Sequence, residues 1–163
     1  MRFPQTAQMN SVDVQTTVGA LTFCFGVMGA GKSRRLVELE REIRGTDASY
    51  LVIVCIPETA PAVHSQSSVK TVRSRAGTST PALQLGVDLS LDDLSDRVAD
   101  AHNSHNYTHV TVLVDEAQFL TSAEVDALAA LVDRDRLDNS VVCFGLRTDF
   151  LGRAFEGVHS CLD

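Results

Sequence analysis

The sequence predicts an α/β fold in which a mostly parallel β-sheet carries helices on both faces. Short apolar runs without the alternation of a half-exposed sheet indicate strands that are buried on both faces. Four runs fit this description: residues 21–27, 50–56, 110–114 and 141–146. Segments of helical periodicity lie between them, and strands that alternate with helices favour a parallel sheet covered on both sides.

Three segments place apolar residues on one helical stripe: residues 32–44, 91–102 and 122–134. We expect Gly45 to end the first helix, since glycine often follows a last helical turn. Ser90 stands where an N-cap would cap the second. Thr121 and Glu124 have the spacing of a capping box at the start of the third.

Length and charge restrict the possible classes of protein. A chain of 163 residues is long enough for one hydrophobic core, and we expect one domain over residues 20–163. Residues 1–19 are polar with little periodicity, so we interpret them as a loosely ordered extension. A net charge of -7 argues against a nucleic-acid partner. No membrane partner is expected either, because no apolar run has the length of a membrane span and no signal peptide is evident, so we expect a cytoplasmic location.

The cysteines predict neither a disulfide framework nor a zinc site. Cys24, Cys55 and Cys143 lie in apolar runs, where cysteine behaves as a small buried hydrophobic residue, and Cys161 lies near the end of the chain. The sequence has no C-x-x-C motif and no His/Cys cluster.

A phosphate-binding loop (P-loop) is the strongest signal. Residues 26–33 match G-x-x-x-x-G-K-[ST] between a predicted strand and a predicted helix. In such a loop, successive backbone N–H groups and the helix N-terminus face the phosphates. The lysine reaches the β- and γ-phosphates, and the Ser33 hydroxyl is a candidate Mg²⁺ ligand. The nucleotide-binding candidates are Gly26, Val27, Met28, Gly29, Ala30, Gly31, Lys32 and Ser33.

An acidic pair follows the third predicted strand. Asp115 at the end of an apolar strand has the Walker B arrangement, which brings a carboxylate to the Mg²⁺ of the P-loop. Glu116 leaves the sheet in another direction, so it is a candidate base for the hydroxyl of a small alcohol.

Three segments together resemble the type II (zinc-dependent) thymidine kinases: GVMGAGKS at 26–33, LVDEAQFL at 113–120 and VCFGLRTDFLG at 142–152. The long segment 57–81 contributes a basic part, VRSRAG at 72–77, similar to bacterial members. Loops of such length are usually functional or disordered. Its Arg73 and Arg75, and also Arg147, could each contact phosphate or an acidic partner surface, although an exposed arginine is more often only solvated.

The resemblance implies an α/β fold of the P-loop NTPase type, with ATP and Mg²⁺ as cofactors and thymidine as the acceptor. Glu116 would be the base that activates the thymidine 5′-hydroxyl. Asp115, Ala117 and Gln118 would lie beside the nucleotide. Four side chains would line the thymine pocket, although such residues are more often core: Met28, Phe119, Leu146 and Phe150. A homo-tetramer is implied as well.

The sequence departs from the family in two places. A C-terminal zinc-bearing segment that closes over thymine in the family does not follow residue 157, and the zinc cysteines it would carry are absent. We therefore expect this polypeptide to bind Mg²⁺-ATP better than it phosphorylates thymidine. After the second strand, residues 57–61 stand where the family often has an acidic and basic pair, and we assign no role to Glu58, the only acidic residue among them.

The sequence leaves two other functions open. The chain could be a P-loop ATPase or nucleotide-binding module with no nucleoside acceptor, in which Glu116 polarises water. It could also be a non-catalytic relative that binds nucleotide, which the missing segment favours and the intact Lys32, Ser33, Asp115 and Glu116 oppose.

Overall fold

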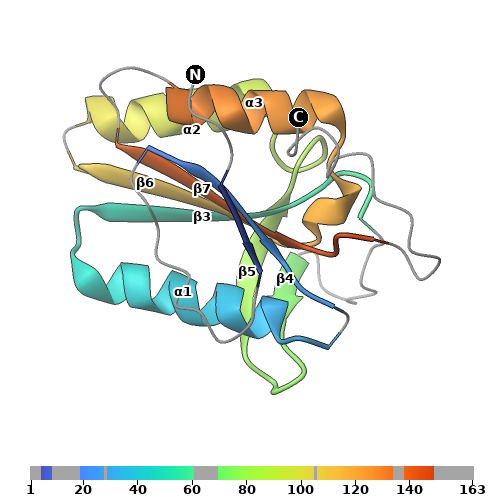
Figure 1. The fold of residues 1–163 in the computed structure, drawn as a ribbon. Coiled ribbons are helices and arrows are strands. Elements are labelled where there is room, and N and C mark those ends of the chain that lie inside the picture. Colours follow the sequence, from blue (N-terminus) through green and yellow to red (C-terminus); the bar gives the residue numbers. More distant parts are fainter. Residues whose placement is uncertain are drawn as a thin grey trace.

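The structure is a computed structural model that describes residues 5–8, 19–27, 29–60, 70–104, 106–133 and 138–148. A twisted sheet forms its middle layer (Figure 1). Helix α1 (Lys32–Thr46) covers one face, and α2 (Leu91–Asn103) and α3 (Ser122–Asp133) cover the other. The predicted α/β class is confirmed.

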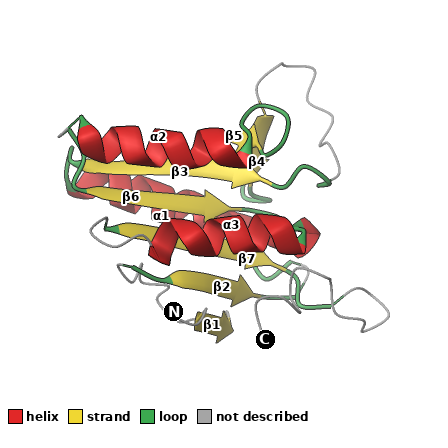
Figure 2. Cartoon of the chain, turned by 90° about the horizontal axis from the view of Figure 1, so that it is seen from above, coloured by secondary structure: helices red, strands yellow, loops and turns green. Residues whose placement is uncertain are grey.

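The sheet has seven strands in the described residues, in the order β1-β2-β7-β6-β3-β5-β4. Figure 2 shows its long strands side by side. Every neighbouring pair is parallel except β4 and β5, which form an antiparallel hairpin. The strands are β1 (Gln5–Gln8), β2 (Leu21–Phe25), β3 (Tyr50–Ile56), β4 (Lys70–Arg73), β5 (Ser79–Gln84), β6 (His109–Val114) and β7 (Asn139–Gly145).

Alternate side chains of the central strands enter two separate cores, which explains why these strands are apolar throughout. In β6, Val110, Val112 and Val114 pack beneath α2 and α3, whereas Leu113 faces the α1 side. The same alternation buries the cysteines of β2, β3 and β7, all of which are free thiols. Their predicted burial is confirmed, and Cys161 lies outside the described residues.

The helix boundaries follow local capping chemistry. The Asp93 N–H donates to Ser90 Oγ over 3.0 Å at the start of α2. At α3, Thr121 and Glu124 form the predicted capping box, with N–H to side-chain distances of 2.8 and 3.2 Å. The prediction that Gly45 ends the first helix is wrong. The helix continues through it to Thr46 and ends where Asp47 becomes extended.

Three strands were not predicted. Strand β1 lies within the segment interpreted as an extension, where it pairs with β2, and β4 and β5 lie within or across the end of the long segment 57–81. Polar strands at the edges of a sheet carry no clear hydrophobic period, because their stability depends on backbone hydrogen bonds to a neighbouring strand. Among the described residues, no helix has the length and apolar character required to cross a membrane.

The parallel pairing has one consequence for function. The carboxyl ends of β2, β6 and β7 meet at one edge of the sheet. The P-loop, the acidic pair and the segment that follows Gly145 therefore come together there, as expected for ligand sites of open α/β sheets.

Candidate functional site

The P-loop connects the end of β2 to the start of α1. Gly29 and Gly31 have φ values of 83° and 80°, in the left-handed region that glycine adopts without steric cost. The Gly26 N–H donates to the Gly145 carbonyl over 3.2 Å, which fastens the loop to β7. Met28 lies outside the described residues.

The Lys32 side chain folds back over this loop. Its Nζ lies 2.8 Å from the Val27 carbonyl oxygen and 3.3 Å from that of Gly26. Burial lowers the pKa of Lys32, and the carboxylates of Glu116 and Asp115 oppose that shift. A cation therefore lies between the P-loop and the acidic pair, where it can contact the outer phosphates of a nucleotide.

Ser33 and Asp115 form the candidate magnesium site. The Ser33 hydroxyl donates to Asp115 Oδ2 over 3.0 Å. Burial, together with the neighbouring Glu116 carboxylate, raises the pKa of Asp115 to about 6. Among the described residues, no three His, Cys, Asp or Glu side chains gather into a metal-binding set. Magnesium in nucleotide sites needs only one or two protein oxygens beside the phosphates, so this hydroxyl and carboxylate fit the ion.

Glu116 follows Asp115 in the chain but differs from it in burial. It is the only non-glycine residue with positive φ among the described residues, at 53°, and it precedes the short helix η1 (Ala117–Phe119). Asp115 is buried whereas Glu116 is exposed, so the two carboxylates lie in different environments. A left-handed backbone costs an ordinary residue about 1 kcal/mol, and such strain is concentrated at functional sites.

Gln118 joins this acidic segment to β7. Its Nε2 donates to Glu116 Oε2. Its Oε1 accepts from the Leu146 N–H over 3.2 Å. Gly145 makes this contact possible, since a Cβ atom there would lie 2.9 Å from the Gln118 backbone nitrogen.

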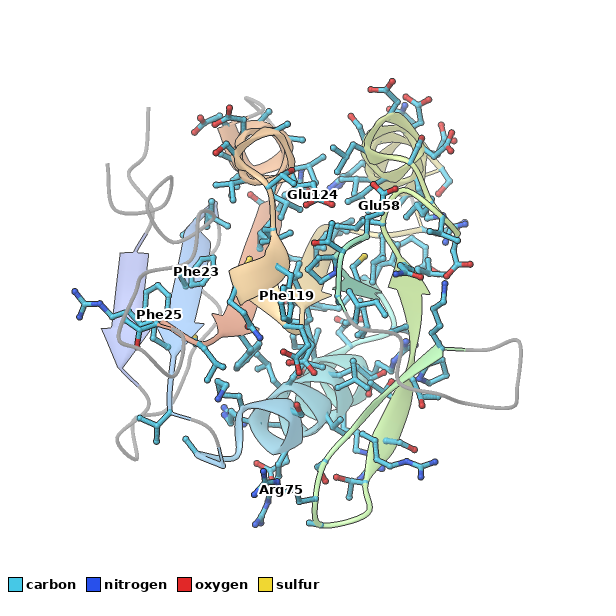
Figure 3. All side chains as sticks on the ribbon, turned by 90° about the vertical axis from the view of Figure 1, so that its right-hand side faces the viewer. Phe23, Phe25, Glu58, Arg75, Phe119 and Glu124 are labelled. Atoms are coloured by element: carbon cyan, nitrogen blue, oxygen red, sulfur yellow. The ribbon has the colours of Figure 1, made fainter. Side chains whose placement is uncertain are left out.

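The β4–β5 hairpin completes the site. Its turn extends beyond the sheet on the side of α1, and Arg75 reaches the start of that helix (Figure 3). A Cβ atom on Gly29 would lie 3.4 Å from Arg75 Nη1. The sequence offered only one signal for this approach, the basic composition of residues 72–77.

These elements enclose a pocket of about 570 Å³. Nine predicted site residues line it: Gly29, Gly31, Lys32, Ser33, Asp115, Glu116, Gln118, Phe119 and Leu146. Six more residues line it: Arg34, Arg73, Ser74, Arg75, Ala76 and Phe144. The sequence had indicated Arg73 and Arg75 as candidate phosphate contacts. Phe144 could have been found from its place near the end of a strand beside the P-loop strand. Ser74 and Ala76 carry no chemical signal, and only the fold of the hairpin brings them in.

Four predicted site residues do not line the pocket: Gly26, Val27, Ala30 and Ala117. The first three shape the loop through their backbone, and Val27 is 77% exposed. Ala117 is fully buried in the core beneath α2 and α3, so its methyl group faces the core. Phe150 lies outside the described residues.

Comparison with known proteins agrees with this geometry. The family model described as thymidine kinase matches residues 19–163. A thymidine kinase of Coxiella burnetii is 35% identical over 138 residues, which cover 84% of this chain and 64% of that protein.

Two further relatives are similar to the same degree. The thymidine kinase of Shewanella oneidensis is 34% identical over 142 residues, covering 87% of this chain and 67% of the relative. That of Xanthomonas axonopodis pv. citri is 36% identical over 137 residues, covering 84% and 60%. This chain therefore spans roughly two thirds of the length of these relatives. It belongs to the thymidine kinase family.

Proposed function

We propose that the protein transfers the γ-phosphoryl group of ATP to the 5′-hydroxyl of thymidine. The observation that carries this proposal is one pocket shared by Lys32, the Ser33–Asp115 pair and Glu116. A phosphate cradle beside an exposed carboxylate is the arrangement that a kinase of a small alcohol needs. The relatives are named thymidine kinases, which supports thymidine as the acceptor in this proposal.

Each group of residues has its own role in the proposed reaction. The loop N–H groups and Lys32 hold the phosphates. Ser33 and Asp115 would hold Mg²⁺, which neutralises phosphate charge when bound. Glu116 accepts the proton of the 5′-hydroxyl while that oxygen forms its bond to the γ-phosphorus. The bond from this phosphorus to the β-phosphate oxygen breaks, and ADP leaves with the electron pair. Phe119 and Leu146 line the same pocket, and we propose that they contact thymine.

The test measures ADP and dTMP formed from Mg²⁺-ATP, with and without thymidine, in the wild type and Glu116→Gln. We expect thymidine-dependent formation of both products, reduced about 100-fold or more in the variant. Glu58→Gln is the matched control, because Glu58 is an exposed glutamate that follows the neighbouring strand β3 and does not line the pocket. We expect it to retain wild-type turnover.

The same assay separates the other functions. ADP release that thymidine does not increase would make the protein an ATPase, and the proposal would fail. ATP binding without either product would leave a nucleotide-binding module.

Three broader features belong to the proposal. Residues 20–163 would form one kinase domain, which the extent of the family match supports. The homo-tetramer rests on the resemblance alone, and the cytoplasmic location rests on the sequence alone. Light scattering of the purified protein would test the tetramer, and fractionation of the source cells would test the location.

A further inference from the structure

Gln118 is a buried amide between the ends of two neighbouring strands. It is 4% exposed, and its two polar atoms contact two segments that are far apart in the chain. Nε2 donates to Glu116, which follows β6, and Oε1 accepts from Leu146, which follows β7. Gln118 is therefore placed to fix the relative position of these two segments.

Chemistry determines which way this amide faces. The Leu146 backbone offers only a hydrogen-bond donor at its N–H, so the Gln118 oxygen must face it. The nitrogen then faces Glu116, whose ionised carboxylate only accepts hydrogen bonds. Both contacts agree on one orientation, and a reversed amide would break both.

The backbone around Gln118 is held as closely as its side chain. Gly145 packs against the Gln118 nitrogen, leaving no room for a Cβ atom. On the other side of η1, Thr59 Oγ1 donates to the Phe119 carbonyl over 2.8 Å. The short helix is thus fastened to β7 and to the segment that follows β3.

We infer that Gln118 is a positioning residue, which fixes the Glu116 carboxylate relative to Leu146 and so relative to the acceptor. This rests on the proposed function, in which Glu116 accepts the acceptor proton. An exposed glutamate otherwise rotates about three side-chain bonds. A hydrogen bond to one carboxylate oxygen restricts that motion and leaves the other oxygen to receive the proton, and misplacement of a reacting group by about 1 Å can cost 100-fold in rate.

The resemblance to the family places Gln118 beside the nucleotide instead. Its geometry here directs both polar atoms to the protein. The two roles differ in a measurable way: a nucleotide contact affects substrate binding, whereas a positioning contact affects the chemical step.

Two variants separate the two hydrogen bonds. Gln118→Met has a similar shape and removes both. Gln118→Glu keeps an oxygen for the Leu146 N–H but places a second carboxylate against Glu116. We expect kcat to fall about 10- to 100-fold in both variants, with the KM values for ATP and thymidine within about twofold of the wild type. Gln84→Met is the matched control, because Gln84 is also buried, donates to the Glu58 carbonyl over 2.9 Å and lies outside the pocket. It should retain the wild-type kcat.

Hydrogen exchange provides a readout that does not depend on activity. The Leu146 amide should exchange about tenfold faster in Gln118→Met than in the wild type, and at an unchanged rate in Gln118→Glu. An unchanged rate in Gln118→Met would overturn the proposed link. A rise in KM with unchanged kcat would overturn it in favour of a nucleotide contact. A wild type without thymidine-dependent transfer would contradict the proposed function instead, and the exchange rate of Leu146 would still decide whether the link exists.

Discussion

The Ser33 hydroxyl lies 3.0 Å from Asp115 Oδ2, although the two residues are 82 positions apart in the chain. Ser33 is in the first turn of α1, and Asp115 directly follows β6. The hydrogen bond places two hard oxygen ligands side by side. It also gives the Asp115 carboxylate, which is only 6% exposed, a hydrogen-bond donor in place of water.

Removing the Ser33 hydroxyl should weaken the binding of Mg²⁺. We expect Ser33→Ala to raise the Mg²⁺ concentration needed for half-maximal activity about tenfold, because one oxygen ligand is lost. Ser33→Thr retains the hydroxyl and should stay within about threefold of the wild type. A magnesium titration at saturating ATP measures both. Equal titration curves for Ser33→Ala and the wild type would show that Ser33 is not a ligand of the metal.

Asp115 should destabilise the protein at neutral pH when no metal or nucleotide is bound. Its pKa is raised from 3.8 to about 6, so the folded state retains a proton that the unfolded state has released. Stability is therefore lost as the pH rises from about 4 to 6, at a cost of up to ~3 kcal/mol above that range. We expect Asp115→Asn to be more stable than the wild type by about 2 kcal/mol at pH 7.5.

Urea unfolding in EDTA, at pH 7.5 and at pH 4.5, measures this effect. The advantage of Asp115→Asn should shrink at the lower pH, where the wild-type carboxyl is mostly protonated in the folded state. A variant less stable than the wild type at pH 7.5 would contradict the expected cost of the buried charge.

Gly145 should be intolerant of any side chain. An alanine Cβ would lie 2.9 Å from the Gln118 nitrogen and 3.0 Å from its Oε1, and a backbone atom cannot move aside without shifting η1. We expect Gly145→Ala to lower the free energy of unfolding by about 1 to 3 kcal/mol and kcat about tenfold.

Gly45→Ala is the matched control for that change. Gly45 lies inside α1 with open space at the Cβ position, so alanine should stabilise the protein by about 0.5 to 1 kcal/mol. Thermal unfolding and steady-state kinetics on both variants check the pair. If the two substitutions changed stability and kcat equally, the close approach of β7 to Gln118 would contribute to neither.

Arg75 should contribute to the binding of ATP. Its guanidinium approaches the P-loop at Gly29 and lines the pocket, and a charge-assisted hydrogen bond to phosphate contributes about 1.5 to 3 kcal/mol. We expect Arg75→Ala to raise the Kd of Mg²⁺-ATP about 10- to 100-fold, measured by calorimetry. Arg41→Ala, on the exposed face of α1 and outside the pocket, should leave the Kd unchanged.

The local patterns of the sequence were sufficient for the central fold. Strand β3 was predicted over its full length at residues 50–56, and the two helix starts at Ser90 and Thr121 have the caps their residues indicated. These features depend on neighbours in the chain or on burial on both faces, which leaves a periodic signal. Strands β1 and β4 carry no such signal, because pairing with another strand stabilises them.

The sequence by itself determined the residue types of the site, through the spacing of residues 26–33 and the acidic pair after β6. Only the tertiary structure decided which of them meet. Parallel pairing of β2, β7 and β6 sets Ser33 beside Asp115, and the hairpin brings Arg75 to Gly29. Gln118 shows the same limit, because its partners come from the ends of two strands and no local pattern specifies that contact. Local propensity acts over a few residues, whereas such contacts depend on the register of the whole sheet.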